Sequence, residues 1–491
     1  VTYFDIPVNN FDDASLNYNI PADQKNSSGY ENVGHTVSSL FARLNYNYKE
    51  KYLAEGLIRR DGSSRFGANN KYGIFPSFSL GWVVSKEDFL IDNPNINMLK
   101  IRGGYGVVGN DNIGDFAFLS TIGGGRNYTI GLTDIYTVGN SPNAPSNPDL
   151  KWEQTSQANI GLELSFLRNF NLTFDWFNKV TTGILQNPRI PGYVGAIGNP
   201  AANVADMKNT GVELELGYKN RLGEVNFSLN GNASYLKNEV TDIGAGVSFL
   251  NGAGFQASTY NITRTMVGEA FNSFYGFKTM GIFQNQGEIE AYKNADGALI
   301  QPNARPGDFK WADLDGNGAI DANDRTFIGD PTPNWSFGFT LNLEWNNFDA
   351  LVFGQGVAGN KVFQGLRRLD INNANYSTRA LGRWTGEGSS NDYPRLTDAD
   401  ANNNFTNPSE FYLEDGSYFR LKTVQIGYSI PSDITRRIGL QKIRLYAMAE
   451  NLLTFTKYTG YDPEIGGGIM SIDRGIYPQA RSYMFGLNVA F

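Results

Sequence analysis

Segments in which apolar residues alternate with polar or small ones recur along most of the chain. The segment 481–491 shows the pattern, and one face of the strand that it predicts carries Tyr483, Phe485, Leu487, Val489 and Phe491. No apolar run reaches the length of about 18 residues that a membrane-spanning helix needs. A chain of this kind can therefore enter a membrane only as a closed β-barrel, in which neighbouring strands satisfy each other's backbone groups.

Acidic residues occupy the polar face of several predicted strands. They include Glu163, Asp175, Glu213 and Glu215, each flanked in sequence by large apolar residues. In the core of a soluble sandwich such charges need buried partners, whereas the wall of a water-filled lumen accepts them. A sandwich with its second face in water accepts them too. The pattern therefore favours an outer-membrane barrel and leaves a soluble β-rich protein as the alternative.

The alternation predicts an all-β fold with about 13 strands, joined by short turns and long loops in turn. About eight strands fall in residues 36–240 and about five in 335–491, while 1–35 and 241–334 read as long extracellular segments. An odd number of antiparallel strands cannot close on itself. We therefore expect the chain to be the carboxy-terminal part of a larger transmembrane antiparallel barrel.

Two of these segments carry finer predictions. In residues 335–345 a Trp stands at each end of an apolar stripe, as expected for a strand between the two aromatic girdles of a membrane barrel. In residues 417–430 the apolar phase slips between Leu421 and Val424, which predicts a β-bulge.

The composition excludes several kinds of chemistry. The chain has no Cys and a single His, His35, so cysteine nucleophiles, thiolate metal sites and Ser-His-Asp triads are absent. It also has no P-loop, dinucleotide fingerprint or nucleophile elbow. A net charge of −8 argues against nucleic acid as a partner. We expect no catalytic residues and no enzyme activity.

Residues 313–324 match the calcium-binding loop of an EF-hand, which places oxygen ligands at fixed positions around one cation. The candidate ligands are Asp313, Asp315, Asn317, the Ala319 carbonyl, Asp321 and Asp324. Gly318 permits the sharp turn between them. Asp324 departs from the pattern, because the last position normally holds a bidentate Glu. With no helices expected on either side, the sequence predicts a structural Ca²⁺ in an extracellular loop, or a metal-free loop rich in Asx-turns.

Four aromatic residues lie in loops rich in Ser, Thr, Asn and Gly, where they could stack against a sugar or a peptide. They are Trp311, Tyr376, Trp384 and Tyr393. Packing between the loops is the alternative explanation.

Several short motifs are spread over nearly the whole chain, at residues 72–82, 99–106, 147–153, 273–277, 281–284, 313–330, 417–422, 426–428, 451–453, 461–464 and in the terminal strand. In sequence and in order they resemble the SusC/RagA family of TonB-dependent outer-membrane transporters.

The resemblance implies a barrel of about 22 strands, filled by an amino-terminal plug that this sequence does not contain. It implies import of glycans or oligopeptides through the outer membrane, energised by TonB–ExbB–ExbD, with a SusD-like lipoprotein as lid and with dimers of such pairs as an option. Phe491 resembles the terminal aromatic residue that the barrel-assembly machinery recognises. The alternatives are a receptor for siderophores or cobalamin, a passive porin, and a secreted calcium-stabilised adhesin or carbohydrate-binding protein.

Overall fold

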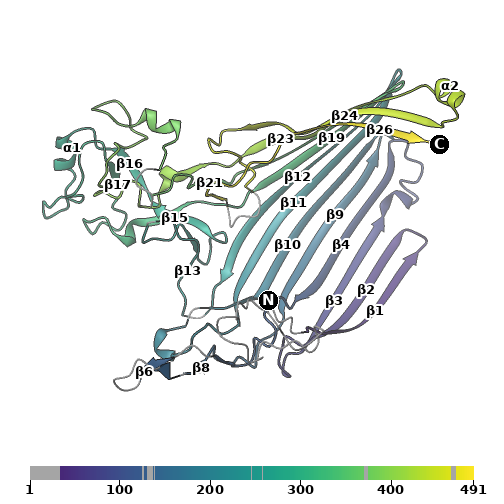
Figure 1. Ribbon diagram of the computed structural model, residues 1–491. Coiled ribbons are helices and arrows are strands. Elements are labelled where there is room, and N and C mark those ends of the chain that lie inside the picture. The colour runs from purple at the N-terminus through teal and green to yellow at the C-terminus, as the bar shows by residue number, and fades with distance from the viewer. Residues whose placement is uncertain are drawn as a thin grey trace, which may run out of the picture.

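The computed structural model describes residues 34–123, 127–129, 136–137, 139–188, 190–244, 246–256, 258–369, 374–465 and 471–491. Its main feature is one antiparallel sheet of 13 strands, seen as the long tilted ribbons of Figure 1. In spatial order the strands are β1 (Val37–Tyr48), β2 (Tyr52–Ser63), β3 (Tyr72–Val83), β4 (Ile96–Asn110), β9 (Glu153–Phe166), β10 (Phe170–Gln186), β11 (Ala202–Leu222), β12 (Val225–Asp242), β19 (Trp335–Trp345), β20 (Phe348–Ala358), β23 (Tyr418–Ser429), β24 (Lys442–Thr456) and β26 (Ser482–Ala490).

The sheet confirms the predicted fold class and its local details. Eight of the strands lie between Val37 and Asp242 and five between Trp335 and Ala490. The expected bulge is at Lys422, which both neighbouring strands skip in the register. Among the described residues, β1 and β26 each pair with a single strand of the sheet, so the sheet has two open edges. The predicted loop 1–35 lies almost wholly outside the described residues.

The connections at the two ends of the strands differ in length. At one end are tight turns and two short connections, which contain η2 (Val84–Lys86), α2 (Ser432–Thr435) and η7 (Arg436–Ile438). The turn between β1 and β2 is typical, with positive φ angles of 53° at Lys49 and 54° at Glu50. The long loops are at the other end of the strands, away from α2 in Figure 1.

The loops after β2, β4 and β10 share a small apolar core. Its buried residues are Phe66, Phe75, Leu150, Trp152, Leu185 and Ala201. The loops after β4 and β10 also contain short elements: β5 (Ile122–Gly123), β6 (Tyr128–Thr129), β7 (Tyr136–Thr137), β8 (Ser141–Pro142) and η3 (Gly192–Val194).

The loops after β12, β20 and β24 pack into a second body beside the sheet, at the left of Figure 1. We call the described parts of residues 243–334, 359–417 and 457–481 the loop lobe. Its strands are β13 (Leu250–Asn251), β14 (Thr263–Thr265), β15 (Ser273–Phe277), β16 (Thr279–Ile282), β17 (Phe309–Trp311), β18 (Arg325–Gly329), β21 (Lys361–Gln364), β22 (Leu413–Asp415) and β25 (Ile472–Asp473). Its helices are α1 (Gln286–Ala291), η4 (Ala322–Asp324), η5 (Thr378–Gly382) and η6 (Glu410–Tyr412). No helix in the described part of the chain is long and apolar enough to cross a membrane.

Contacts between distant parts of the sequence hold the lobe together. Strand β21 pairs in parallel with β25, which places Phe363 beside Ile472. Phe363 is fully buried in a cluster with Phe255, Phe274 and Tyr412. The three loops that the sequence presents separately therefore form one folded unit with its own core.

Candidate functional site

One face of the 13-stranded sheet carries a connected set of charges. The register places Lys100 opposite Glu163 and Asp175 opposite Glu213, and residues directly opposite each other share a face. Arg102 links them, because its Nε lies 2.8 Å from Glu163 Oε1 and its Nη2 lies 2.6 Å from Asp175 Oδ2. Lys100 Nζ lies 3.3 Å from Glu163 Oε1. Two of the acidic residues that the sequence places on the polar face, Glu163 and Asp175, thus have partners there.

Of the hollows on this polar face, two are lined by the linked charges or by their acidic neighbours. One, of about 500 Å³, is lined by Glu55, Lys100, Arg102 and Asn159 among others. The other, of about 240 Å³, is lined by Asp175, Glu213, Glu215, Asn232 and several hydroxyl-bearing residues. A wall with both signs of charge, amides and hydroxyls can bind polar solutes by many weak contacts.

The opposite face of the sheet is apolar and open. Leu214 is 44 % exposed, Leu487 59 % and Phe485 86 %, although side chains of this kind are normally buried in soluble proteins. Exposed apolar stripes of this extent need an apolar medium or a partner to cover them.

The EF-hand-like loop brings three of its predicted ligands together. Carboxylate oxygens of Asp313, Asp315 and Asp324 lie within 4.8 Å of one another. Asp324 is fully buried and accepts hydrogen bonds from the backbone N–H groups of Leu314 and Asp321, each at 2.7 Å. Among the described residues, no ion pair involves these three carboxylates. As predicted, no α-helix flanks the loop among the described residues, because β17 precedes it, the short η4 forms its last three residues and β18 follows it.

The other predicted ligands of this loop lie around the three carboxylates. Asp321 caps η4, with its Oδ1 accepting from the Asn323 N–H at 2.7 Å, and its Oδ2 accepts from Asn317 Nδ2 at 3.2 Å. Ala319 donates its N–H to Asn317 Oδ1 at 2.8 Å. These contacts are the Asx-turn network that the metal-free alternative predicts, and the same oxygens are hard ligands suited to Ca²⁺.

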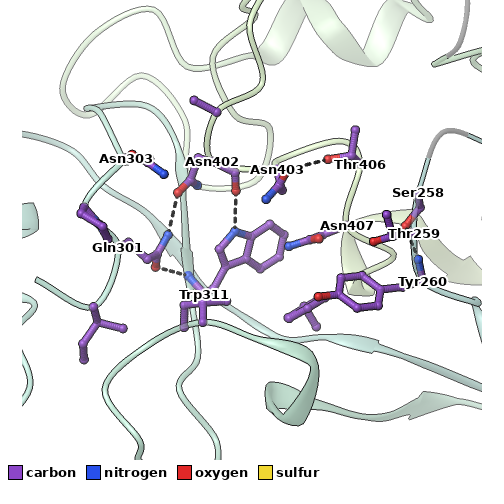
Figure 2. A pocket seen from close by; sticks show the side chains of 15 residues that line it. Ser258, Thr259, Tyr260, Gln301, Asn303, Trp311, Asn402, Asn403, Thr406 and Asn407 are labelled. Atoms are coloured by element: carbon purple, nitrogen blue, oxygen red, sulfur yellow. Dashed lines mark hydrogen bonds between the residues drawn. The ribbon is translucent and has the colours of Figure 1, made fainter.

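Trp311 forms the wall of a pocket of about 260 Å³ in the loop lobe, shown in Figure 2. Only 1 % of its surface is exposed, and its indole N–H donates to the Asn402 carbonyl at 3.0 Å. Gln301 fixes it further, because the Trp311 backbone N–H donates to Gln301 Oε1 at 2.8 Å. Trp311 therefore belongs to the core of the lobe and offers no open ring face to a ligand.

The structure divides the other three predicted aromatic residues between two places. Trp384 packs on the cluster that contains Trp311, and its indole N–H donates to Gln284 Oε1 at 3.1 Å. Tyr376 and Tyr393 instead line one pocket of about 340 Å³, together with Arg367. Burial raises the pKa of the Tyr393 hydroxyl, so this phenol stays neutral near pH 7.

A buried ion-pair network near β23 was not recognised from the sequence, although its residues lie in motifs of the family. Arg420 is 3 % exposed and pairs with Asp462 and with Glu464, the latter at 2.7 Å. Lys422, at the bulge, also contacts Glu464 at 2.7 Å. The network fixes the loop after β24 to the sheet. Its signal in the sequence is a pair of basic residues at 420 and 422 and a pair of acidic residues at 462 and 464.

Phe491 follows the end of β26 and is 84 % exposed. Its predicted role as an assembly signal remains a prediction.

Comparison with known proteins identifies the family. Residues 2–452 match the family model described as TonB dependent receptor-like, beta-barrel. The chain belongs to this family. Its members are outer-membrane proteins, which explains the exposed apolar stripe as the lipid-facing surface of a barrel wall. The family is one of receptors and transporters rather than a class of enzymes.

Relatives narrow the assignment to the SusC/RagA type of TonB-dependent receptor. TonB-dependent receptor P3 of Formosa agariphila is 33 % identical over 484 residues, covering 94 % of this chain and 46 % of the relative. TonB-dependent receptor SusC of Bacteroides thetaiotaomicron is 30 % identical over 470 residues, covering 93 % and 44 %. A structure of the RagAB peptide transporter superimposes with a TM-score of 0.76 at 26 % identity, covering 93 % of this chain and 48 % of that one. The chain thus spans slightly less than half the length of these relatives.

Proposed function

We propose that this chain forms the carboxy-terminal barrel wall of a SusC-like active importer for glycans or oligopeptides. In this proposal TonB–ExbB–ExbD supplies the energy through a part of the receptor that the sequence does not cover. The observation that carries the proposal is the pairing of a lipid-compatible face with a polar face of linked charges on the same 13 strands. A transport wall needs both faces, whereas neither is needed for catalysis.

The loop lobe is the surface on which we propose that a SusD-like lipoprotein acts as a lid. It lies at the long-loop end of the strands, next to the mouth that a closed barrel would have. Its own buried core supports this role, because a docking surface has to keep its shape. Support also comes from similarity to SusC and to the RagAB transporter.

Uptake by cells is the direct test. A strain lacking the gene should lose growth on one class of glycan or peptide in a panel and regain it with the full-length receptor. Co-purification of a lipoprotein with the receptor would support the lid. Uptake of a siderophore or cobalamin instead would favour the alternative receptor class, and uptake that is independent of TonB would favour a passive porin.

We further propose that residues 313–324 bind a structural Ca²⁺. The support is the convergence of Asp313, Asp315 and Asp324, because three carboxylates this close repel one another unless a cation lies between them. The Asn317 and Asp321 side chains and the Ala319 carbonyl are the further ligands. Bound Ca²⁺ would tie this loop to the lobe, since Asp313 donates its backbone N–H to the hydroxyl of Tyr292, which itself donates to the Trp311 carbonyl. Calcium titration monitored by protease resistance of the loop tests the site.

A further inference from the structure

A second pocket in the loop lobe combines positive charge with aromatic rings. Its lining includes Arg367, Arg368, Arg379, Tyr376 and Tyr393, and no Asp or Glu is among the described residues that line it. We call it the arginine–tyrosine pocket. Three arginines around one opening are unusual in a chain whose net charge is −8. The contacts of Arg367 and Arg379 decide whether this charge is available to a ligand.

Arg367 is the residue with the least compensation. Its guanidinium carbon lies 4.1 Å from the centre of the Tyr376 ring, and its Nη2 donates to the Tyr376 hydroxyl at 2.9 Å. Its Nε is buried without an acceptor, and no carboxylate among the described residues pairs with it. A buried charged donor without an acceptor is unfavourable. An anionic group bound in the pocket would offset the positive charge of this guanidinium.

Arg379, which also lines the pocket, packs against two aromatic rings. It lies 4.5 Å from the centre of the Phe411 ring and 6.0 Å from that of Tyr393. The carboxylate that approaches it is Glu414, at 3.8 Å. That carboxylate already accepts three hydrogen bonds, from Gln364 Nε2 and from the backbone and hydroxyl of Thr459. Much of the charge of Arg379 is thus available to a ligand.

Aromatic faces border the same opening. Tyr376 is 42 % exposed and Tyr461 71 % exposed, and both line the pocket. An exposed tyrosine ring offers a flat apolar surface with a polar edge, which fits the apolar face of a sugar ring. The volume of about 340 Å³ lies at the lower end of the range for small-ligand sites, roughly 300–1,000 Å³.

We propose that the arginine–tyrosine pocket binds an acidic sugar residue of an oligosaccharide, with the anionic group on the arginines and the sugar ring on the tyrosines. The anionic group is a carboxylate or a sulfate ester, both of which match the fork of an arginine side chain. This inference rests on the proposed import function and narrows its substrate to anionic glycans.

A peptide fits the pocket less well. Extended peptides are commonly recognised through main-chain hydrogen bonds to a free strand edge. The strand that reaches the pocket is β21, through Gln364, and it already has β22 on one side and β25 on the other. A neutral sugar would bring no anionic group to Arg367.

Binding to the purified full-length receptor, with its lipoprotein where one co-purifies, tests the proposal by calorimetry. The probes are an oligogalacturonate, a neutral galactan oligosaccharide of equal length, a sulfated galactan oligosaccharide and an oligoglutamate peptide. We expect one or both anionic sugars to bind, with affinity falling as salt rises. Arg367→Gln should weaken that binding about tenfold or more, since a charge-assisted hydrogen bond is lost. The matched control Arg305→Gln, an exposed arginine of the same lobe outside the pocket, should change it less than about twofold.

Two further variants keep the test decisive if Arg367→Gln fails to fold. Tyr376→Ala alters a residue that is 42 % exposed and should also weaken binding, while Arg367→Lys should restore part of it in low salt. Equal binding of neutral and anionic sugars, preference for the peptide, or no effect of the Arg367 and Tyr376 variants would each overturn the inference. Uptake of neutral glycans by cells with no binding of anionic ones would overturn it and leave the importer intact. Loss of the importer function itself would show as no uptake of any glycan or peptide.

Discussion

The sheet exposes large apolar side chains, whereas the loop lobe buries them. On the sheet, Leu40 is 72 % exposed and Phe485 86 %, whereas in the lobe Phe274 and Phe363 are fully buried. Both regions draw on the same amino acids. The difference lies in the surrounding medium, because lipid accepts an apolar stripe and water does not. The lobe therefore follows the rules of a soluble protein, and the sheet follows those of a membrane barrel.

The largest expected effect is on the core of the lobe. Phe363→Ala should destabilise the lobe by about 3–5 kcal/mol, since it removes a buried ring and leaves a cavity. The matched control is Tyr477→Ala, at a ring that is 87 % exposed, with an expected change within about 0.5 kcal/mol. Limited proteolysis in urea, followed by mass spectrometry of the lobe fragments, measures the difference. Unchanged protease resistance of the Phe363 variant would show that the lobe is not an independently packed unit.

The next effect concerns the apolar face of the sheet. Leu214→Arg should cost about 2–4 kcal/mol in lipid, because it places a charge against hydrocarbon. Asn232→Arg is the control, since Asn232 lines the hollow on the polar face, where water solvates a charge. Folding into lipid vesicles, followed by heat-modifiable migration on a gel, compares the two. If Asn232→Arg were the more damaging, the face assigned to lipid and the face assigned to water would have to be exchanged.

The same contrast explains what could be predicted from the sequence. Strand β19 (Trp335–Trp345) could be predicted because its side chains point alternately into two different media, which produces a period of two in the sequence. The EF-hand-like loop could be predicted because its candidate ligands are close together in the sequence. The lobe lacks such a signal. The pairing of Phe363 with Ile472 joins residues more than a hundred positions apart, and no periodicity marks either one.

The candidate sites follow the same rule. Asp313, Asp315 and Asp324 could be named together because they lie in one short loop of the sequence. The arginine–tyrosine pocket could not, since Arg367, Tyr393 and Tyr461 meet only through the tertiary packing of the lobe. Trp311 lies in a loop, and loops are usually exposed, but here Trp384 and Phe411 of a second loop pack against the cluster that buries it.

A moderate effect is expected from calcium, which should raise the stability of the lobe and leave that of the sheet unchanged. At a concentration ten times the Kd, Ca²⁺ should stabilise the lobe by about 1.4 kcal/mol. Asp313→Ala combined with Asp315→Ala should remove this gain and loosen residues 308–330, with heat-modifiable migration unchanged. Asp296→Ala, at an exposed position nearby, is the control. Protease sensitivity that is the same with and without chelator would count against the site.

The smallest expected effect is the response of the lobe to acid. The pKa of the Asp415 carboxyl lies below its usual value of 3.8, chiefly because the Ser417 hydroxyl hydrogen-bonds to it. A lowered pKa in the folded state means that Asp415 contributes stability at pH values above the unfolded pKa, and that this contribution is lost as the pH falls through the folded pKa. The contribution should be below about 1 kcal/mol, since this carboxylate is largely solvated.

Asp415→Asn removes the titrating group, so the stability of the lobe should fall less steeply below about pH 4 than in the wild type. Thermal unfolding of the lobe between pH 3 and 6, with Asp296→Asn as control, measures this slope. The sheet is the internal reference, because its heat-modifiable migration should be the same in both variants. An Asp415 variant with the wild-type acid slope would mean that the Ser417 contact does not persist in solution.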